Sequence, residues 1–128
     1  MQGKWVVIAA TAGLSAVAAG AFGVHALEER LDADDLATFE VAARYQMYHA
    51  LALLAVAGVS SVRPSRIVSA AGICMVLGII LFSGSLYGLT LLQWRWLGPI
   101  TPLGGVAFLF GWLLLALAAC RPAKRASS

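Results

Sequence analysis

Charge is what this chain of 128 residues has little of. Charged side chains make up 12% of it, whereas hydrophobic residues make up 61%. A soluble domain carries about a quarter charged residues, so this composition is typical of an integral membrane protein. The charges behind the net balance of +3 lie at the ends of apolar segments and form no basic patch. We therefore expect the lipid bilayer, and no nucleic acid, as a partner.

Cysteine and the usual catalytic motifs are also scarce. Cys74 and Cys120 lie in or at the end of apolar segments, without CxxC or metal-ligand spacing. We expect two small buried hydrophobes in a reducing compartment, with no disulfide and no metal site. No GxSxG, HExxH, Walker or GxGxxG motif occurs, so we predict no enzymatic activity and no cofactor. A haem between His25 and His49 matches the ligand type but is set aside, because the two lie at different depths.

What the sequence has instead is a series of four apolar segments, at about residues 5–26, 33–60, 67–92 and 101–120. About 20 apolar residues suffice to span the hydrocarbon core of a bilayer. We predict an all-α fold: an integral membrane four-helix bundle with antiparallel neighbours and short loops, forming a single domain over residues 1–128. The first segment exceeds the roughly 7–15 apolar residues of a signal peptide and is interpreted as a mature helix. The basic tail, 121–128, is expected to be flexible.

The positions of the positive charges predict the orientation. With four spans, six lysines and arginines fall on one side and two on the other: Lys4, Arg63, Arg66, Arg121, Lys124 and Arg125 against Arg30 and Arg95. By the positive-inside rule, both termini then lie in the cytoplasm and the acidic loop around residues 27–36 lies outside.

The polar residues of the second segment gather in its first half. Residues in a helix advance by about 100° each, so Glu40, Arg44 and Tyr48 share one strip. Tyr45 and His49 form a second strip on a roughly opposite side. Glu40 and Arg44 stand four residues apart, which favours an ion pair between them.

Depth predicts that polar residues from several segments meet near the outer boundary. Alternate spans run in opposite directions, which brings Tyr87 near the level of Arg44 and Ser83 near that of His49. The resulting hypothesis is a ligand or partner site that comprises His25, Glu40, Arg44, Tyr45, Tyr48, His49, Ser83, Tyr87 and Thr101. The alternative is structural: Arg44 leans toward the interface beside Glu40, and His49 is a neutral imidazole bonded to a serine or tyrosine hydroxyl.

Glycines recur near helical spacing in the apolar segments. Small residues let helix backbones approach closely in lipid, so we predict helix packing at Gly20, Gly23, Gly84, Gly88, Gly104 and Gly105. Gly84 and Gly88 form a GxxxG pair. At the start of the fourth segment, Thr101 is suited to cap the helix and Pro102 to its first position.

Four blocks of the sequence carry a family resemblance. They are GAFGVHAL (20–27), TFEVAARYQMYHALALL (38–54), ILFSGSLYGL (80–89) and LGPITPLGGVAFLFGWLLLALAA (97–119). Together they resemble the uncharacterised family filed as domain of unknown function 423, which includes the eukaryotic transmembrane protein 256. The resemblance implies a small multi-pass protein of the bacterial inner membrane. It supplies no catalytic or ligand-binding residue.

Three functional interpretations stay open at this stage. The first is a non-enzymatic accessory or assembly protein, packing against a membrane-protein partner or against itself as a homo-oligomer. The second is a binder of a lipid, quinone or similar amphiphile, with Arg44 and the start of the fourth helix near its head group. The third is a small-solute transporter that forms only as an oligomer.

Overall fold

The computed structural model describes residues 2–122, and this part of the chain is helical with no strand. Four of its helices are long and apolar enough to cross a membrane: Gly3–Leu27, Ala33–Val62, Arg66–Leu91 and Arg95–Cys120. These are the four expected apolar segments. The flexible tail that the sequence predicts falls mostly on residues 123–128, which lie outside the described part.

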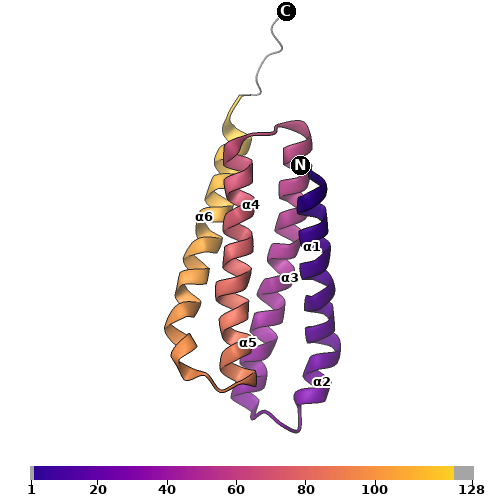
Figure 1. Ribbon diagram of the computed structural model, residues 1–128, viewed down its shortest axis with the longest axis vertical. Helices are drawn as coiled ribbons and strands as arrows, with labels where there is room; N and C mark the ends of the chain where they lie inside the picture. Colours follow the sequence, from indigo (N-terminus) through magenta and orange to yellow (C-terminus); the bar gives the residue numbers. More distant parts are fainter. Residues whose placement is uncertain (1, 123–128) are drawn as a thin grey trace, which may run out of the picture.

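The four spans divide into shorter helical elements (Figure 1). In chain order, the first span contains α1 (Gln2–Val17), η1 (Ala18–Gly23) and α2 (Val24–Leu27), and the second is α3 (Ala33–Val62). The third contains α4 (Arg66–Gly78), η2 (Ile79–Ser83) and α5 (Gly84–Leu91), and the fourth contains η3 (Arg95–Ile100) and α6 (Thr101–Cys120).

Side-chain caps begin the second and third spans. The carboxylate of Asp32 accepts a hydrogen bond from the Asp35 amide at 2.8 Å, and the Ser65 hydroxyl accepts one from the Val68 amide at 3.2 Å. Such caps satisfy amides that lack a partner in the first helical turn. The fourth span begins differently from the prediction. The 3₁₀ helix η3 leads directly into α6, and the Thr101 side chain makes no capping bond.

The helix α3 lies at the centre of the arrangement. It packs along α1 on one side and against α4 and α5 on another, while α6 packs chiefly along α4. The connections lie at alternate ends, so the start of α1 and the end of α6 share one end of the bundle (Figure 1). We call this the terminal end. The opposite end, with the loops at 28–32 and 92–94, is the acidic-loop end.

An apolar core fills the terminal half of the bundle. Leu53, Val56 and Met75 are fully buried there, and the Trp5 ring is 3% exposed. The ring of Trp5 occupies the space above Gly72, where an added Cβ would lie 2.5 Å from its nearest atom. The remaining buried members of this cluster are Ala9, Ala52, Ala57, Val68, Ala71 and Ala118. This half of the molecule is closed by ordinary side-chain packing.

Glycines at three helix contacts are required by close approach. A Cβ on Gly104 would lie 2.7 Å from the Cα of Phe82, so the backbones of α6 and η2 nearly touch there. Gly78 accommodates the ring of Phe108, and Gly111 accommodates the Met75 sulfur, which would lie 2.9 Å from an added Cβ. Of these, only Gly104 is among the packing glycines predicted from the sequence.

The other predicted packing glycines differ in what surrounds them. Nothing lies within 4 Å of a Cβ placed on Gly84 or Gly105, so neither glycine packs against another span of this chain. Gly88 faces Leu97 of η3, at the start of the fourth span. Gly20 and Gly23 do face α3: an added Cβ would lie 3.9 Å from Ala43 Cβ and 3.2 Å from the Phe39 ring, respectively.

A π-helical turn interrupts the first and the third span. The amide of Val24 bonds to the Ala19 carbonyl, and that of Gly84 bonds to the Ile79 carbonyl, five residues back in each case. A π turn accommodates one residue more than an α turn. Because one residue corresponds to about 100° of rotation, each interruption changes which residues face the neighbouring helices.

Candidate functional site

The inward side of α3 carries a buried amide that joins three spans. Gln46 is 6% exposed. Its Nε2 donates to the Ala12 carbonyl at 2.9 Å and to Ser15 Oγ at 2.7 Å, and its Oε1 accepts from the Tyr87 hydroxyl at 2.6 Å. Gln46 uses both amide hydrogens and its carbonyl oxygen in this way. The predicted site omits it, although a carboxamide within a buried helix is itself a signal for such a network.

Two hydroxyl bonds tie the third span to its neighbours. Ser83 is fully buried, and its Oγ donates to the Ala42 carbonyl of α3 at 2.7 Å. The hydroxyls of Ser85 and Thr101 lie 2.6 Å apart and join α5 to α6. The sequence predicts Ser83 near the level of His49, but in the structure it lies level with Ala42. The difference is seven residues of α3, or about 10 Å along its axis.

His49 is also fully engaged by the protein. It is 4% exposed, and its ring stacks on Phe108 with 3.4 Å between the ring centroids. Its Nδ1 lies 2.7 Å from the Tyr45 carbonyl, and its Nε2 lies 3.1 Å from the indole nitrogen of Trp112. A carbonyl can only accept and an indole N–H can only donate. This geometry assigns a neutral imidazole with its hydrogen on Nδ1.

The partners of His49 differ from those predicted, since they are a carbonyl and an indole rather than a hydroxyl. Phe108 and Trp112 are not among the predicted site residues. Tyr45 extends this aromatic group, with its ring 4.7 Å from that of Phe82. His25 is remote from it: it lies near the end of α2, is largely exposed, and places its Nδ1 3.5 Å from Glu28. The two histidines do not come together.

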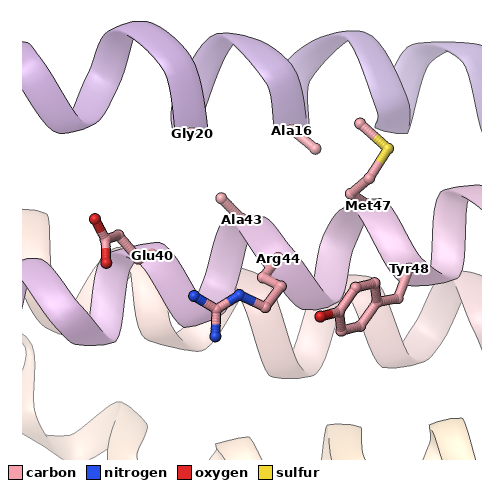
Figure 2. Close-up of a pocket in the computed structure, with 7 residues that line it drawn as sticks. All are labelled: Ala16, Gly20, Glu40, Ala43, Arg44, Met47 and Tyr48. Carbon is pink, nitrogen blue, oxygen red and sulfur yellow. The ribbon is translucent and has the colours of Figure 1, made fainter.

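Glu40, Arg44 and Tyr48 lie on the other side of α3, and all three are exposed. They line an open groove of about 440 Å³ between α3 and the first span, together with Ala16, Gly20, Ala43 and Met47. In Figure 2 the Arg44 side chain extends along the helix toward Glu40, and the Tyr48 hydroxyl points toward Arg44.

The predicted Glu40–Arg44 ion pair is not formed. Within residues 2–122 the oppositely charged or potentially charged side chains in contact are Arg95 with Asp35 and His25 with Glu28, and neither contact includes Glu40 or Arg44. The same part of the chain contains no side-chain hydrogen bond from Glu40 or Arg44. Two opposite charges thus stand beside each other on an exposed helix face, each without a partner in the described chain.

A separate polar group closes the acidic-loop end. Gln93 has a positive φ of 58°, which turns the chain between α5 and η3. Its Nε2 donates to the Thr90 carbonyl at 2.7 Å and to Asp35 Oδ2 at 3.1 Å, while Arg95 Nη2 donates to its Oε1 at 2.7 Å. From the sequence, Arg95 indicates only the orientation, and neither Asp35 nor Gln93 is among the predicted site residues.

The predicted convergence of nine residues is therefore wrong. Those on the inward side are held by hydrogen bonds: His49, Ser83, Tyr87 and Thr101. Tyr45 lies between the two sides: it is exposed, and its ring is 4.7 Å from that of Phe82 and 5.7 Å from that of Tyr48. Those exposed on the opposite side of α3 are Glu40, Arg44 and Tyr48. His25 belongs to neither group. The exposed three form the candidate site, which we call the α3 outer face.

The family model described as protein of unknown function (DUF423) matches residues 19–105. The chain belongs to the DUF423 family. This confirms the resemblance seen in the sequence.

The DUF423 assignment agrees with individual relatives. A UPF0382 membrane protein of Staphylococcus saprophyticus is 47% identical over 113 residues, which cover 88% of this chain and 93% of the relative. YwdK of Bacillus subtilis, also named a UPF0382 membrane protein, is 44% identical over 91% of this chain and 96% of its own length. A relative of Haemophilus influenzae is 40% identical over 91% of this chain and 93% of its own length. No solved structure matches.

These relatives are named membrane proteins, and this DUF423 chain has four helices suited to span a membrane. We therefore describe it as a membrane protein in contact with the lipid bilayer. Exposed side chains along the spans then face lipid or another protein within the membrane. The α3 outer face is such a surface, and its two charges are unusual for it.

Proposed function

We propose that this protein is a non-enzymatic accessory protein that acts by associating with a protein partner inside the membrane, through the α3 outer face. The observation that carries the proposal is the position of Glu40 and Arg44. Both are exposed on a membrane-spanning helix, and neither is ion-paired within the described chain. An arginine or an acidic residue costs about 2.5–3.5 kcal/mol at the centre of a spanning helix by insertion measurements, and less toward its ends, where Glu40 and Arg44 lie. A partner with complementary charges removes much of this cost.

The inward polar groups support a non-enzymatic role. Gln46, Tyr87 and His49 direct their polar atoms at one another, at carbonyls or at Trp112. A substrate in their place would have to break these bonds before it could be recognised. We therefore assign the inward network to holding the spans together.

We propose a bacterial inner-membrane location, with neighbouring spans antiparallel across the bilayer and both termini in the cytoplasm. The support is the excess of lysine and arginine at the terminal end. A reporter that is active only outside the cytoplasm, fused after residue 122, should be inactive. The same reporter inserted in the loop at 28–32 should be active, and the reverse pattern would contradict the orientation.

An amphiphile is the second candidate partner. It is favoured by the groove of about 440 Å³ between α3 and the first span, which has an apolar wall and Arg44 within it (Figure 2). An anionic head group could pair with the guanidinium, but Glu40 in the same groove would repel it. We do not extend the proposal to transport through a single chain, because the terminal half of the bundle is filled by side chains such as Trp5 and Leu53; transport would require an oligomer.

Native mass spectrometry of the protein, released from its own membranes in mild detergent, tests the proposal. We expect a complex with a second polypeptide chain, either another copy or a different protein, and its loss in Arg44→Gln. Arg95→Gln is the matched control, because Arg95 already has a partner in Asp35. A bare monomer would contradict the proposal. A monomer with a lipid that is lost in Arg44→Gln would favour the amphiphile.

A further inference from the structure

The α3 outer face is part of a stripe that runs the length of the helix. Exposed residues recur on it at intervals of three or four, from the acidic-loop end to the terminal end: Ala37, Glu40, Arg44, Tyr48, Leu51, Ala55 and Gly58. This spacing keeps them on one side of a helix with 3.6 residues per turn. The stripe is therefore long enough to contact another helix along most of a membrane span.

Small residues flank the charged part of the stripe. Ala37 precedes it, and Ala55 and Gly58 follow it. A Cβ placed on Gly58 would meet nothing within 4 Å, so this glycine is not required by packing inside the chain. Small residues on a membrane helix allow a second helix to approach its backbone. By themselves they do not identify the second helix.

The two charges on the stripe indicate which helix packs against it. Glu40 and Arg44 are one turn apart, about 6 Å along the axis. Helical side chains lean toward the N-terminus, and Arg44 does so in Figure 2, which brings its guanidinium toward the level of Glu40. The surface therefore presents one negative and one positive group at similar depth, and it is complementary to a copy of itself.

We propose that the stripe binds a second copy of this chain, in a two-fold dimer where Glu40 of each copy pairs with Arg44 of the other. A two-fold axis along the membrane normal places the two α3 helices parallel, with equal residues at equal depth. Each interface then contains two reciprocal ion pairs. This inference rests on the proposed function and specifies its partner.

A second copy fits the stripe better than a lipid does. A head group would engage only the charged third of the stripe near the acidic-loop end. It would leave Ala55 and Gly58, toward the terminal end, without a role. A parallel helix uses both parts, since small residues on the two copies meet at the same depth.

Charge reversal distinguishes pairing between copies from pairing within one copy. Two forms of the full chain with different affinity tags are co-expressed in native membranes, and the fraction that co-purifies is measured. In Glu40→Arg every charge at the interface is positive, and in Arg44→Glu every charge is negative. We expect either variant to lose self-association by about tenfold or more, because like charges oppose each other.

The mixed experiment is the decisive one. When Glu40→Arg carries one tag and Arg44→Glu the other, each basic residue again faces an acidic one. Co-purification should return to within about threefold of the wild-type value. A pair within one chain cannot be restored in this way, because neither variant contains both an acidic and a basic residue at positions 40 and 44.

Matched variants test the position of the interface. Gly58→Leu lies on the stripe and should reduce self-association, whereas Gly105→Leu lies on another span and should not. Neither position has an atom within 4 Å of an added Cβ, so both variants should fold. Arg30→Glu reverses an exposed charge away from α3 and should also leave self-association unchanged.

Three results would overturn the dimer. If the wild type co-purifies with itself but the mixed pair does no better than the single variants, the interface lies elsewhere. If the wild type is bound to a different polypeptide and not to itself, the dimer is wrong while the proposed function stands. If native mass spectrometry detects one chain with only lipid, both are wrong.

Discussion

The two sides of α3 carry polar side chains at similar depth, but they use them differently. On the inward side, Gln46 and His49 have every polar atom engaged by groups from other spans or by the helix itself. On the outward side, Glu40 and Arg44 have no ion-pair partner within the described residues. Polarity inside a membrane helix therefore does not identify a functional residue. The absence of a partner for Glu40 and Arg44 is therefore what supports the proposed role of the α3 outer face.

Because of this difference, we expect substitutions on the two sides of α3 to affect different properties: the stability of the fold on the inward side and association with a partner on the outward side. Hydrogen bonds between membrane helices contribute on average about 0.6 kcal/mol and at most about 1.7 kcal/mol. Substitutions on the inward side should therefore lower the free energy of unfolding. Substitutions on the outward side should leave it nearly unchanged and reduce the association with a partner.

The largest effect is expected at Gly104. A leucine side chain there would clash with the backbone of Phe82. Gly104→Leu should therefore lower the free energy of unfolding by about 3 kcal/mol or more. Gly105→Leu adds the same side chain one residue later, where space is open, and should change it by less than about 0.5 kcal/mol. Unfolding of the purified protein by sodium dodecyl sulfate provides both values. Equal losses would mean that α6 does not pack on η2 as described.

The next effect is expected at Gln46. Replacing it with leucine removes three hydrogen bonds between spans and leaves the Tyr87 hydroxyl without its acceptor. We expect a loss of about 2 kcal/mol, from roughly 0.6 kcal/mol for each bond. Arg44→Gln, two residues earlier on the outward side, should change stability by less than about 0.5 kcal/mol. If Arg44→Gln were the more destabilising variant, the division of α3 into two sides would be wrong.

Helix periodicity explains what the sequence predicts correctly. Apolar length identifies the four spans, because only helices of about 20 residues satisfy their backbone across a bilayer. The angular advance of 100° per residue separates Glu40 and Arg44 from His49, as the structure has them, whereas Tyr45 is exposed and its ring lies 5.7 Å from that of Tyr48. Both results depend only on properties of one helix at a time.

What the sequence does not predict depends on two helices at once. Periodicity gives the angle between residues on one helix, but it does not give the rotation of that helix against its neighbour. Ser83 is therefore misplaced by seven residues of α3, since it bonds to Ala42. The π turn in the third span also changes the direction of the residues after it, and Gly84 faces open space. Trp112 is missed because it is 63 residues from His49.

A smaller effect is expected at Trp112. The phenylalanine variant keeps an aromatic ring but removes the N–H that donates to His49 Nε2. The imidazole nitrogen is then a buried acceptor without a donor, and we expect a loss of about 0.6–1.7 kcal/mol. Trp96→Phe is the matched control, because Trp96 is 65% exposed.

A double-mutant cycle tests whether the loss of stability in Trp112→Phe comes from the hydrogen bond to His49. In a His49→Phe background the acceptor is absent, so Trp112→Phe should then change stability by less than about 0.3–0.5 kcal/mol. The same loss in both backgrounds would attribute the effect to ring packing and not to the hydrogen bond.

The smallest effect is expected at the acidic-loop end, where the inward and outward sides meet solvent. Asp35 is 9% exposed and binds Gln93, and it lies 3.6 Å from Arg95. Asp34 lies in the same first turn of α3 but is exposed. Either carboxylate interacts favourably with the positive end of the helix dipole. Asp35→Asn and Asp34→Asn should therefore lose the same dipole contribution.

The difference in stability between the two variants measures the interaction of Asp35 with Gln93 and Arg95. We expect Asp35→Asn to be the less stable by about 0.5 kcal/mol, in the range of partly exposed ion pairs, with a smaller difference at high salt. Thermal unfolding in detergent at two salt concentrations measures it. If the two variants were equal at low salt, Gln93 would be held by its bond to Thr90 alone. The loop of residues 92–94 would then keep its positive φ without help from α3, and closure of this end would be a property of the third span by itself.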